Sequence, residues 1–296
     1  MHRYRRLCSA EQSGLFMFRL TGILLLFAFA CVQVSHAAKV RAPDGVFEQA
    51  ACITCHEKTQ ADLVKAWRNS IHARTDRTVD CVACHGNSHK AALPTARKNK
   101  ICIDCHGGDS GPAVHSYATS KHGVIYRLEE TEYDWSRPLA NANYRVPGCA
   151  YCHLHQSNHN VDDSVRAELM DKTAIVGLLQ NMRGICQSCH APRYVTQLFE
   201  NGESMLEIGR MKWREADQLM QQARTEFSKS ELHAAEQQLK KMKLQHLKNV
   251  MLGVGHQSAD YQWWHGHPAL DGDLLRIKGM IGNLRRKTAL NAKQQK

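Results

Sequence analysis

One five-residue pattern accounts for most of the cysteines in this sequence. It reads Cys, two spacer residues, Cys and His, and it occurs five times, at residues 52–56, 81–85, 102–106, 149–153 and 186–190. Two residues between the thiols place both sulfurs on one short turn, where each can form a thioether with a vinyl group of a haem. The adjacent imidazole can then bind the iron as the proximal ligand. This is the attachment signature of c-type haem, so the sequence predicts five covalently bound haems.

The residues that carry this prediction fall into two groups. The residues expected to form thioethers are Cys52, Cys55, Cys81, Cys84, Cys102, Cys105, Cys149, Cys152, Cys186 and Cys189. The expected proximal iron ligands are His56, His85, His106, His153 and His190.

Other cysteine chemistries fit the pattern less well. Four-cysteine zinc sites also use C-x-x-C pairs, but they need no His directly after each pair. Thioredoxin-like redox pairs would not be expected five times in one chain, and disulfides would leave the five following histidines unexplained. The pattern uses ten of the twelve cysteines, and the other two, Cys8 and Cys31, lie near the N-terminus.

The N-terminal residues 1–37 have the features of a signal peptide. Residues 22–32, "GILLLFAFACV", are apolar, arginines precede them, and Ser35-His36-Ala37 supplies small residues at a cleavage site. The apolar run is shorter than the roughly 20 residues that a membrane span needs. We therefore expect export to the periplasm, where c-type haem is attached, and no membrane span after cleavage. Met17 also begins a shorter leader, so the start of translation stays open.

The charge of the chain bears on its partners. The formal net charge is +11, and a basic chain often binds nucleic acid or an acidic membrane surface. The haem propionates would neutralise much of the Lys and Arg excess in this protein. We therefore expect no nucleic-acid partner.

Composition divides the remaining chain into three parts. Residues 38–200 carry the motifs between Gly- and Pro-rich breaks and are predicted to form short helices and loops around the haems. Residues 201–275 contain two apolar stripes at helical spacing, with a break or new cap at 228–231, and end in a Trp-His-Gly segment. Residues 276–296 read as a basic tail. The predicted fold class is mostly α, with little regular structure around the haems and a C-terminal hairpin or bundle of long helices packed on the haem domain.

A second axial ligand for each iron would come from histidines outside the motifs. The candidate distal ligands are His72, His89, His122, His159, His256 and His265. Because His89 and His159 follow their nearest motifs closely, we expect each to reach a neighbouring haem. A filled sixth position suits electron transfer, whereas an open one admits substrate. The supply of histidines exceeds five, so the sequence leaves this choice open.

The segments between the motifs carry a further likeness. They include "AWRNSIHARTDRTVDCVACHG", "CIDCHGGDSGPAVHSYATSKHGVIY", "YDWSRPLANANYRVPGCAYCHLHQSNHNV", "ICQSCHAPRYVTQLFENG" and "ADYQWWHGHPAL". Over most of residues 50–275 the chain resembles the hydroxylamine oxidoreductase family of multihaem cytochromes. The resemblance implies an exported, mostly α-helical protein, often a homotrimer. Family members usually carry eight haems, and one of these oxidises hydroxylamine or related nitrogen compounds, or reduces nitrogen oxides.

The chain departs from that family at the expected catalytic haem. It has five motifs, as in a version shortened at its N-terminal end, and by order the haem on residues 81–85 would match the catalytic one. The family's Asp-His pair follows the next motif, but here Asp109 has no adjacent His and His115 is displaced. Tyr261 is the candidate for the family's cross-linking tyrosine. The related pentahaem nitrite reductases use C-x-x-C-K, whereas all five motifs here end in His.

These observations predict an exported pentahaem electron-transfer cytochrome on a hydroxylamine oxidoreductase-like scaffold. Its expected partners are redox proteins, either quinol-linked or soluble cytochromes. The alternative is an enzyme that oxidises hydroxylamine or reduces nitrite or hydroxylamine at an open second haem. A small nitrogen compound would be its substrate, and His115, Tyr261 and Asp109 its candidate catalytic residues. A second alternative is an electron-transfer subunit docked on a separate catalytic protein.

Overall fold

The computed structural model describes residues 44–161 and 172–294. The predicted signal peptide, residues 1–37, lies outside the described residues. Those that are described belong to one compact unit, Ala42–Lys296. They form helices almost throughout, and their β pairing is a single isolated bridge between Val46 and Ser88. The predicted mostly α fold class is confirmed, and no helix in these residues is long and apolar enough to cross a membrane.

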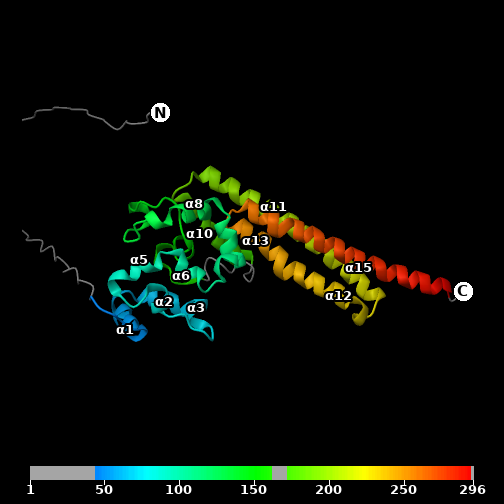
Figure 1. Ribbon diagram of the computed structural model, residues 1–296, viewed down its shortest axis with the longest axis horizontal. Helices are drawn as coiled ribbons and strands as arrows, with labels where there is room; N and C mark the ends of the chain where they lie inside the picture. The colour runs from blue at the N-terminus through cyan, green and yellow to red at the C-terminus, as the bar shows by residue number, and fades with distance from the viewer. Residues whose placement is uncertain (1–43, 162–171, 295–296) are drawn as a thin grey trace, which may run out of the picture. The chain divides into compact units, whose positions relative to one another are not determined.

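The motif-bearing part consists of short helices joined by turns (Figure 1). These are α1 (Gln49–Thr59), α2 (Ala61–Asn69), α3 (Ile71–Arg74), α4 (Cys81–His85), η1 (His89–Ala91), α5 (Ala92–Ala96), α6 (Asn99–Ile103), η2 (Gly108–Ser110), α7 (Pro112–Ala118), α8 (Lys121–Glu129), η3 (Glu130–Glu132), η4 (Leu139–Asn141), α9 (Cys149–His153), η5 (His155–Ser157) and α10 (Lys172–Gln187). Helices this short are marginal unless packing supports them. Yet α1, α3, α4 and α9 bury none of their own residues. Their support must come from other groups, and a flat apolar haem would supply it.

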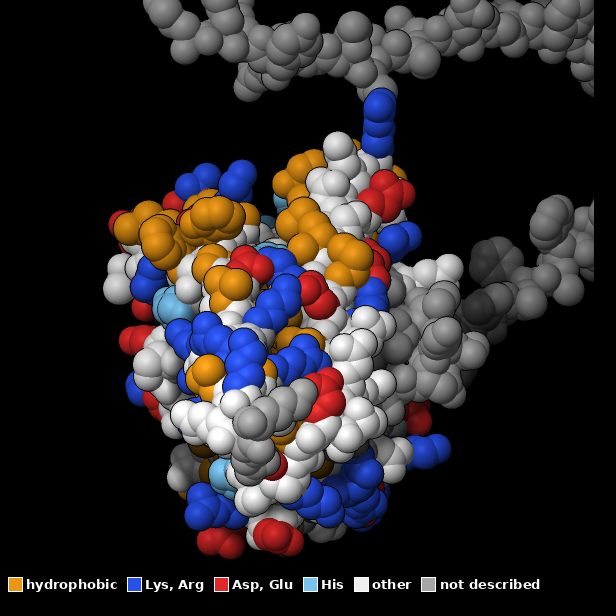
Figure 2. Space-filling view, turned by 90° about the vertical axis from the view of Figure 1, so that its right-hand side faces the viewer, with side chains coloured by type: hydrophobic (Ala, Val, Ile, Leu, Met, Phe, Trp, Pro, Cys, Tyr) orange, Lys and Arg blue, Asp and Glu red, His pale blue; other side chains and the backbone are white. Residues whose placement is uncertain are grey.

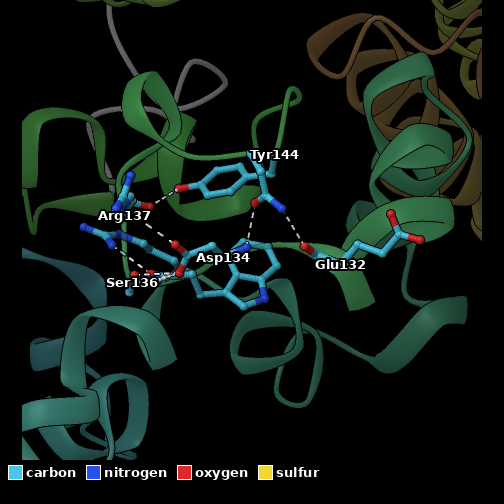
Figure 3. A network of polar contacts seen from close by, with 8 residues as sticks. Glu132, Asp134, Ser136, Arg137 and Tyr144 are labelled. Atoms are coloured by element: carbon cyan, nitrogen blue, oxygen red, sulfur yellow. Dashed lines mark hydrogen bonds and ion pairs between the residues drawn. The ribbon is translucent and has the colours of Figure 1, made fainter.

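An aromatic cluster stabilises the loop that connects α8 to α9. Its buried members are Tyr126, Tyr133, Tyr144 and Val146, with Trp135 packed against them. Figure 3 shows the polar contacts that close this loop, including the Tyr144 hydroxyl donating to the Arg137 carbonyl at 3.0 Å. The loop therefore has a defined conformation with no more regular structure than the two short 3-10 turns η3 and η4.

The C-terminal part is a bundle of long helices. Its elements are α11 (Pro192–Glu226), α12 (Lys229–Lys241), the π-helix η7 (Met242–Leu247), α13 (Lys248–Gly255), α14 (Ala259–Tyr261), the π-helix η8 (Gln262–Gly266) and α15 (His267–Gln294). Helices α11, α12 and α15 pack side by side (Figure 1). Their shared core includes Met220, Leu232, Leu270 and Ile277. Each large apolar side chain buried in this way contributes about 1.5–3 kcal/mol.

The turn between α11 and α12 lies where the sequence places a break. The Ser228 side chain accepts a hydrogen bond from the Glu231 N–H, and the Glu231 carboxylate accepts one from the Ser228 N–H at 2.9 Å. This capping box satisfies two backbone donors that the start of a helix leaves unpaired. The predicted cap at 228–231 is thus confirmed.

Helix α15 differs from the expectation of a basic tail. The helix runs to Gln294, so most of the segment 276–296 is helical. Ile277 and Ile281, one helical turn apart, are fully buried in the bundle core. These two side chains extend the apolar stripe into a segment rich in Lys and Arg. Because the prediction of a basic tail rested on charge alone, it overlooked this stripe.

Two glycines let η8 lie directly on α13. A Cβ atom on Gly253 would lie 2.5 Å from the Cγ atom of Gln262, and one on Gly266 would lie 2.7 Å from Cγ2 of Val250. Both distances are too short for any larger residue without a shift. This close contact fixes the C-terminal end of α13, which leads into His256.

Candidate haem sites

Each motif presents its two thiols and its imidazole from a single turn of backbone. In α4 the Asp80 carboxylate caps the motif by accepting a hydrogen bond from the Ala83 N–H at 2.7 Å. In the third and fifth motifs the backbone N–H of the His donates to the carbonyl of the first Cys at 3.0 Å. None of the ten motif cysteines forms a disulfide, and all are half-buried or exposed. This is the geometry that two thioethers on one haem edge require.

Every motif histidine lies opposite a histidine from outside the motifs. The ring centres are 6.3 Å apart for His56 and His89, 6.0 Å for His85 and His159, 6.1 Å for His106 and His72, 6.3 Å for His153 and His256, and 5.9 Å for His190 and His122.

The spacing of these pairs matches two imidazoles bound to one metal from opposite sides. A metal lies about 2 Å from a ligating ring nitrogen, and the ring centre lies about 1 Å further. Two ligands on opposite faces therefore have ring centres about 6 Å apart. Near-parallel rings in direct contact would be about 3.5–4 Å apart, yet three of the pairs are within 23° of parallel at 5.9–6.3 Å. The residues present thus fit five haem irons, each of which would be held by a motif histidine and a second histidine.

Five of the six candidate distal ligands lie opposite a motif histidine, and one does not. His72, His89, His122, His159 and His256 each lie opposite a motif histidine. His89 and His159 reach earlier motifs, at His56 and His85, as expected from their closeness to their own. The sixth candidate, His265, lies instead against His115 at 4.9 Å and Tyr261 at 4.8 Å, measured between ring centres.

Successive motifs contact one another in chain order. Helix α4 packs on α1, α6 on α4, and α9 on α6. A hydrogen bond with Cys102 raises the pKa of the Cys149 thiol, which places the third and fourth motifs in direct contact. Burial, and then the neighbouring Cys186 and Cys189, raise the pKa of the Cys152 thiol to about 12, which places the fifth motif beside the fourth. Groups attached to these cysteines would form one continuous row.

A family comparison identifies this arrangement. Residues 69–230, more than half of the chain, match the family model described as "Seven times multi-haem cytochrome CxxCH". The chain belongs to this family of multi-haem cytochromes. Membership implies covalently bound c-type haem, as the motifs predict.

Relatives of this multi-haem cytochrome support the predicted resemblance. A curated protein of Kuenenia stuttgartiensis, the "Probable nitrite reductase-hydroxylamine oxidoreductase fusion protein", is 27% identical over 152 residues. The match covers 40% of this chain and 18% of the relative, so the chain spans less than a fifth of that protein's length. The predicted similarity to hydroxylamine oxidoreductase-like multihaem cytochromes is therefore confirmed.

Two solved structures share the fold of the cytochrome. One is the reducing HAO-like protein complex of Kuenenia stuttgartiensis, with 15% identity and a TM-score of 0.56 over 83% of this chain and 87% of that chain. The other is a hypothetical multiheme protein, with 16% identity and a TM-score of 0.57 over 73% of this chain and 59% of that chain.

A buried amide connects the third and fourth motifs of the cytochrome. Asn99, at the start of α6, is 2% exposed, and its side-chain oxygen accepts a hydrogen bond from the Cys149 N–H at 2.7 Å. The Asn99 N–H in turn donates to the Tyr126 hydroxyl at 2.9 Å. A Cβ atom on Gly148 would lie 2.5 Å from the same amide oxygen, so only glycine fits there without a shift. Sequence reasoning missed Asn99 because nothing in its local pattern indicates a contact with residue 149.

Burial keeps several of the paired imidazoles in the neutral form. It is the main cause that lowers the pKa values of His85, His122 and His153. Burial, and then His153, lower the pKa of His256 to about 4. Because only a neutral imidazole has a lone pair for iron, these sites favour metal ligation over protonation.

The ring contacts of the candidate catalytic residues His115 and Tyr261 do not include the histidine of the second motif. His115 contacts Tyr261, with ring centres 5.5 Å apart, and both contact His265. Asp109 is exposed in η2. The second motif's His85 faces His159 instead. Among the described residues, it is therefore His159, and not one of these three candidates, that lies opposite His85.

Proposed function

We propose that this chain is an exported pentahaem c-type cytochrome that transfers electrons through haems with two axial histidines each. One observation carries the proposal: each of the five motif histidines has a second histidine 5.9–6.3 Å away between ring centres. The two histidines of each pair would hold one haem iron between them and leave substrate no place to bind, and the bound haem would supply one-electron chemistry.

The ligand sets follow the motif order. The proposed axial pairs are His56 and His89 for haem 1, His85 and His159 for haem 2, His106 and His72 for haem 3, His153 and His256 for haem 4, and His190 and His122 for haem 5. The ten motif cysteines would form the thioethers. The haem supplies one-electron chemistry when it is bound, and the protein supplies its ligands, its burial and its neighbours.

The contacts between successive motifs support a single path for the electron. The first four motif segments touch in the order α1, α4, α6 and α9, and the fifth adjoins the fourth at Cys152. These contacts would hold haems bound to successive motifs next to one another, as a path for electrons along the chain requires. Export, predicted from residues 1–37, is part of the proposal because c-type haem is attached outside the cytoplasm.

The enzymatic alternative is less favoured by the same geometry. An open second haem would need the space opposite His85, where His159 lies with its ring 15° from parallel. A nitrogen substrate and the candidate catalytic residues stay predictions of that alternative.

Docking on a redox partner is favoured over catalysis by the chain alone. One solved relative of the same fold is a chain of a complex, according to its description. Figure 2 shows Lys and Arg side chains gathered over one face of the molecule, with Asp and Glu among them. A surface of this charge would attract an acidic redox protein and speed its encounter. Soluble or quinol-linked cytochromes are the proposed partners, and the homotrimer stays a prediction.

A reductive titration of the exported protein tests the proposal. We expect the holoprotein to have the mass of the leaderless chain plus five haems. It should take up five electrons per chain, and neither hydroxylamine nor nitrite should be turned over. Uptake of fewer electrons, or steady turnover of either compound, would contradict the proposal.

A further inference from the structure

A buried hydroxyl contacts the distal histidine of the fourth site. Ser116, on α7, is fully buried, and its Oγ atom lies 2.7 Å from Nδ1 of His256. The same Oγ atom lies 2.8 Å from the carbonyl oxygen of Ala113. A serine hydroxyl has one proton to donate, and a carbonyl can only accept. The Ser116 proton is therefore directed to Ala113, and Ser116 accepts a hydrogen bond from Nδ1–H of His256.

This contact decides which ring nitrogen of His256 is free. With the proton on Nδ1, the lone pair is on Nε2, the nitrogen left to bind a metal. The ring faces His153 with 6.3 Å between ring centres. Ser116 therefore selects the tautomer that a second axial ligand needs, and it also restrains the rotation of the ring.

We propose that Ser116 is a positioning residue that orients His256 as an axial ligand of haem 4 and lowers the reduction potential of that haem. The inference rests on the proposed function, because it takes His153 and His256 as the two ligands. An acceptor at Nδ1–H increases the electron density on the imidazole and so stabilises ferric over ferrous iron. Donation from Ser116 to Ala113 polarises the hydroxyl and makes its oxygen a better acceptor.

The acceptor at His256 differs from those at two other paired histidines, and it lies farther away in sequence than the Gln60 side chain that contacts Nδ1 of His56 at 2.9 Å. His85 contacts the backbone carbonyl of Ala92 at 3.2 Å, and His159 contacts that of Ser157 at 2.8 Å. At His256 a side chain 140 residues away in sequence contacts Nδ1, in addition to the backbone carbonyl of Leu252, whose hydrogen bond opposes the lowering of the His256 pKa. A point mutation can therefore remove the side-chain contact and leave the backbone in place, which makes the effect on a single haem measurable.

A neighbouring hydroxyl pair provides a matched control. Thr119, the C-cap residue of α7, has its Oγ1 atom 2.8 Å from Oγ of Ser258, two residues after His256. This bond joins the same two segments but does not contact the His256 ring. A Thr119→Val variant therefore removes a hydroxyl contact between α7 and this turn while leaving the contact between Ser116 and His256.

The experiment uses full-length holoprotein carrying Ser116→Ala, Ser116→Thr, Thr119→Val or His256→Ala. His256→Ala should convert one low-spin iron per chain to high spin in EPR spectra, and the lost signal identifies haem 4. In Ser116→Ala, that signal should change its g values. The reduction equilibrium of haem 4 should shift about threefold to tenfold toward ferrous iron, and tenfold is 59 mV for a one-electron couple. Ser116→Thr should restore both readouts, and Thr119→Val should leave them unchanged.

Three results separate the possible failures. If His256→Ala leaves every low-spin signal intact, the ligand assignment of the proposed function is wrong. If His256→Ala acts as expected but Ser116→Ala matches the wild type, the role of Ser116 alone is refuted. An equal shift in Thr119→Val would assign the effect to packing and would also refute it. Should Ser116→Ala fail to accumulate, Ser116→Cys keeps the volume with a weaker acceptor and must shift the equilibrium in the same direction.

Discussion

Asn99→Ala gives the sharpest test of how the third and fourth motifs are held together. The substitution removes the acceptor of the Cys149 N–H, a 2.7 Å hydrogen bond, at a position that is 2% exposed. It leaves the bond from the Asn99 backbone N–H to Tyr126 in place, because only the side chain is lost. A donor left unpaired inside a protein costs about 1–3 kcal/mol.

This loss of free energy converts into a measurable change in melting temperature. For a unit of this size, 1 kcal/mol corresponds to about 2–4 °C. We therefore expect the Tm of the Asn99→Ala holoprotein to fall by about 2–12 °C, measured by circular dichroism at 222 nm. Chemical denaturation should show a lower midpoint with an unchanged slope.

Asn143→Ala is the matched control for this experiment. The Asn143 side chain accepts from the Asp134 N–H at 2.7 Å and donates to the Glu132 carbonyl at 2.6 Å. Both bonds are exposed, and water can replace them. The control should therefore lose less stability than Asn99→Ala. An equal or larger loss in the control would refute the reasoning from burial.

Three further predictions, one of them with its own control substitution, test neighbouring parts of the account. Gly148→Ala would press a Cβ atom to 2.5 Å from the Asn99 amide oxygen and should destabilise the protein by about 1–3 kcal/mol in chemical denaturation. Gly279→Ala, on the exposed side of α15 with open space around it, should be neutral or slightly stabilising, and a similar loss there would contradict the steric argument. Burial lowers the pKa of the His256 imidazole, so the folded protein disfavours a proton that the unfolded chain binds; stability should be greatest above pH 6.5 and should fall as the pH drops toward 4, with loss of one low-spin haem signal. Acid-insensitive spectra down to pH 4 with unchanged stability would count against this. His159→Ala should open one iron to cyanide or nitrite, seen as a new high-spin signal, and a fully low-spin variant would disprove the assignment of that ligand.

Local pattern was enough to predict the parts of the fold that depend on near neighbours in sequence. The motif turns, the apolar stripes and the cap at Ser228 each involve residues within a few positions of one another. The same holds for the expectation that His89 and His159 reach other motifs, which follows from the short chain between each of them and its own motif.

The contacts between distant segments could not be predicted in this way. Asn99 and Cys149 are 50 residues apart, and Ser116 and His256 are 140 apart. In each case the residue type fits many surface positions, and its burial depends on how whole segments pack. The position of His256, rather than His265, opposite His153 also depends on contacts between distant segments. It requires the close contact between α13 and η8, which small residues at 253 and 266 allow but which the sequence pattern alone does not predict.

Quantitative EPR of the fully oxidised, full-length protein tests the central claim most directly. The account predicts five low-spin ferric irons per chain, with no high-spin signal and no change when hydroxylamine or nitrite is added. A high-spin signal amounting to one iron per chain, altered by either compound, would contradict it and would establish an open haem in place of the second histidine.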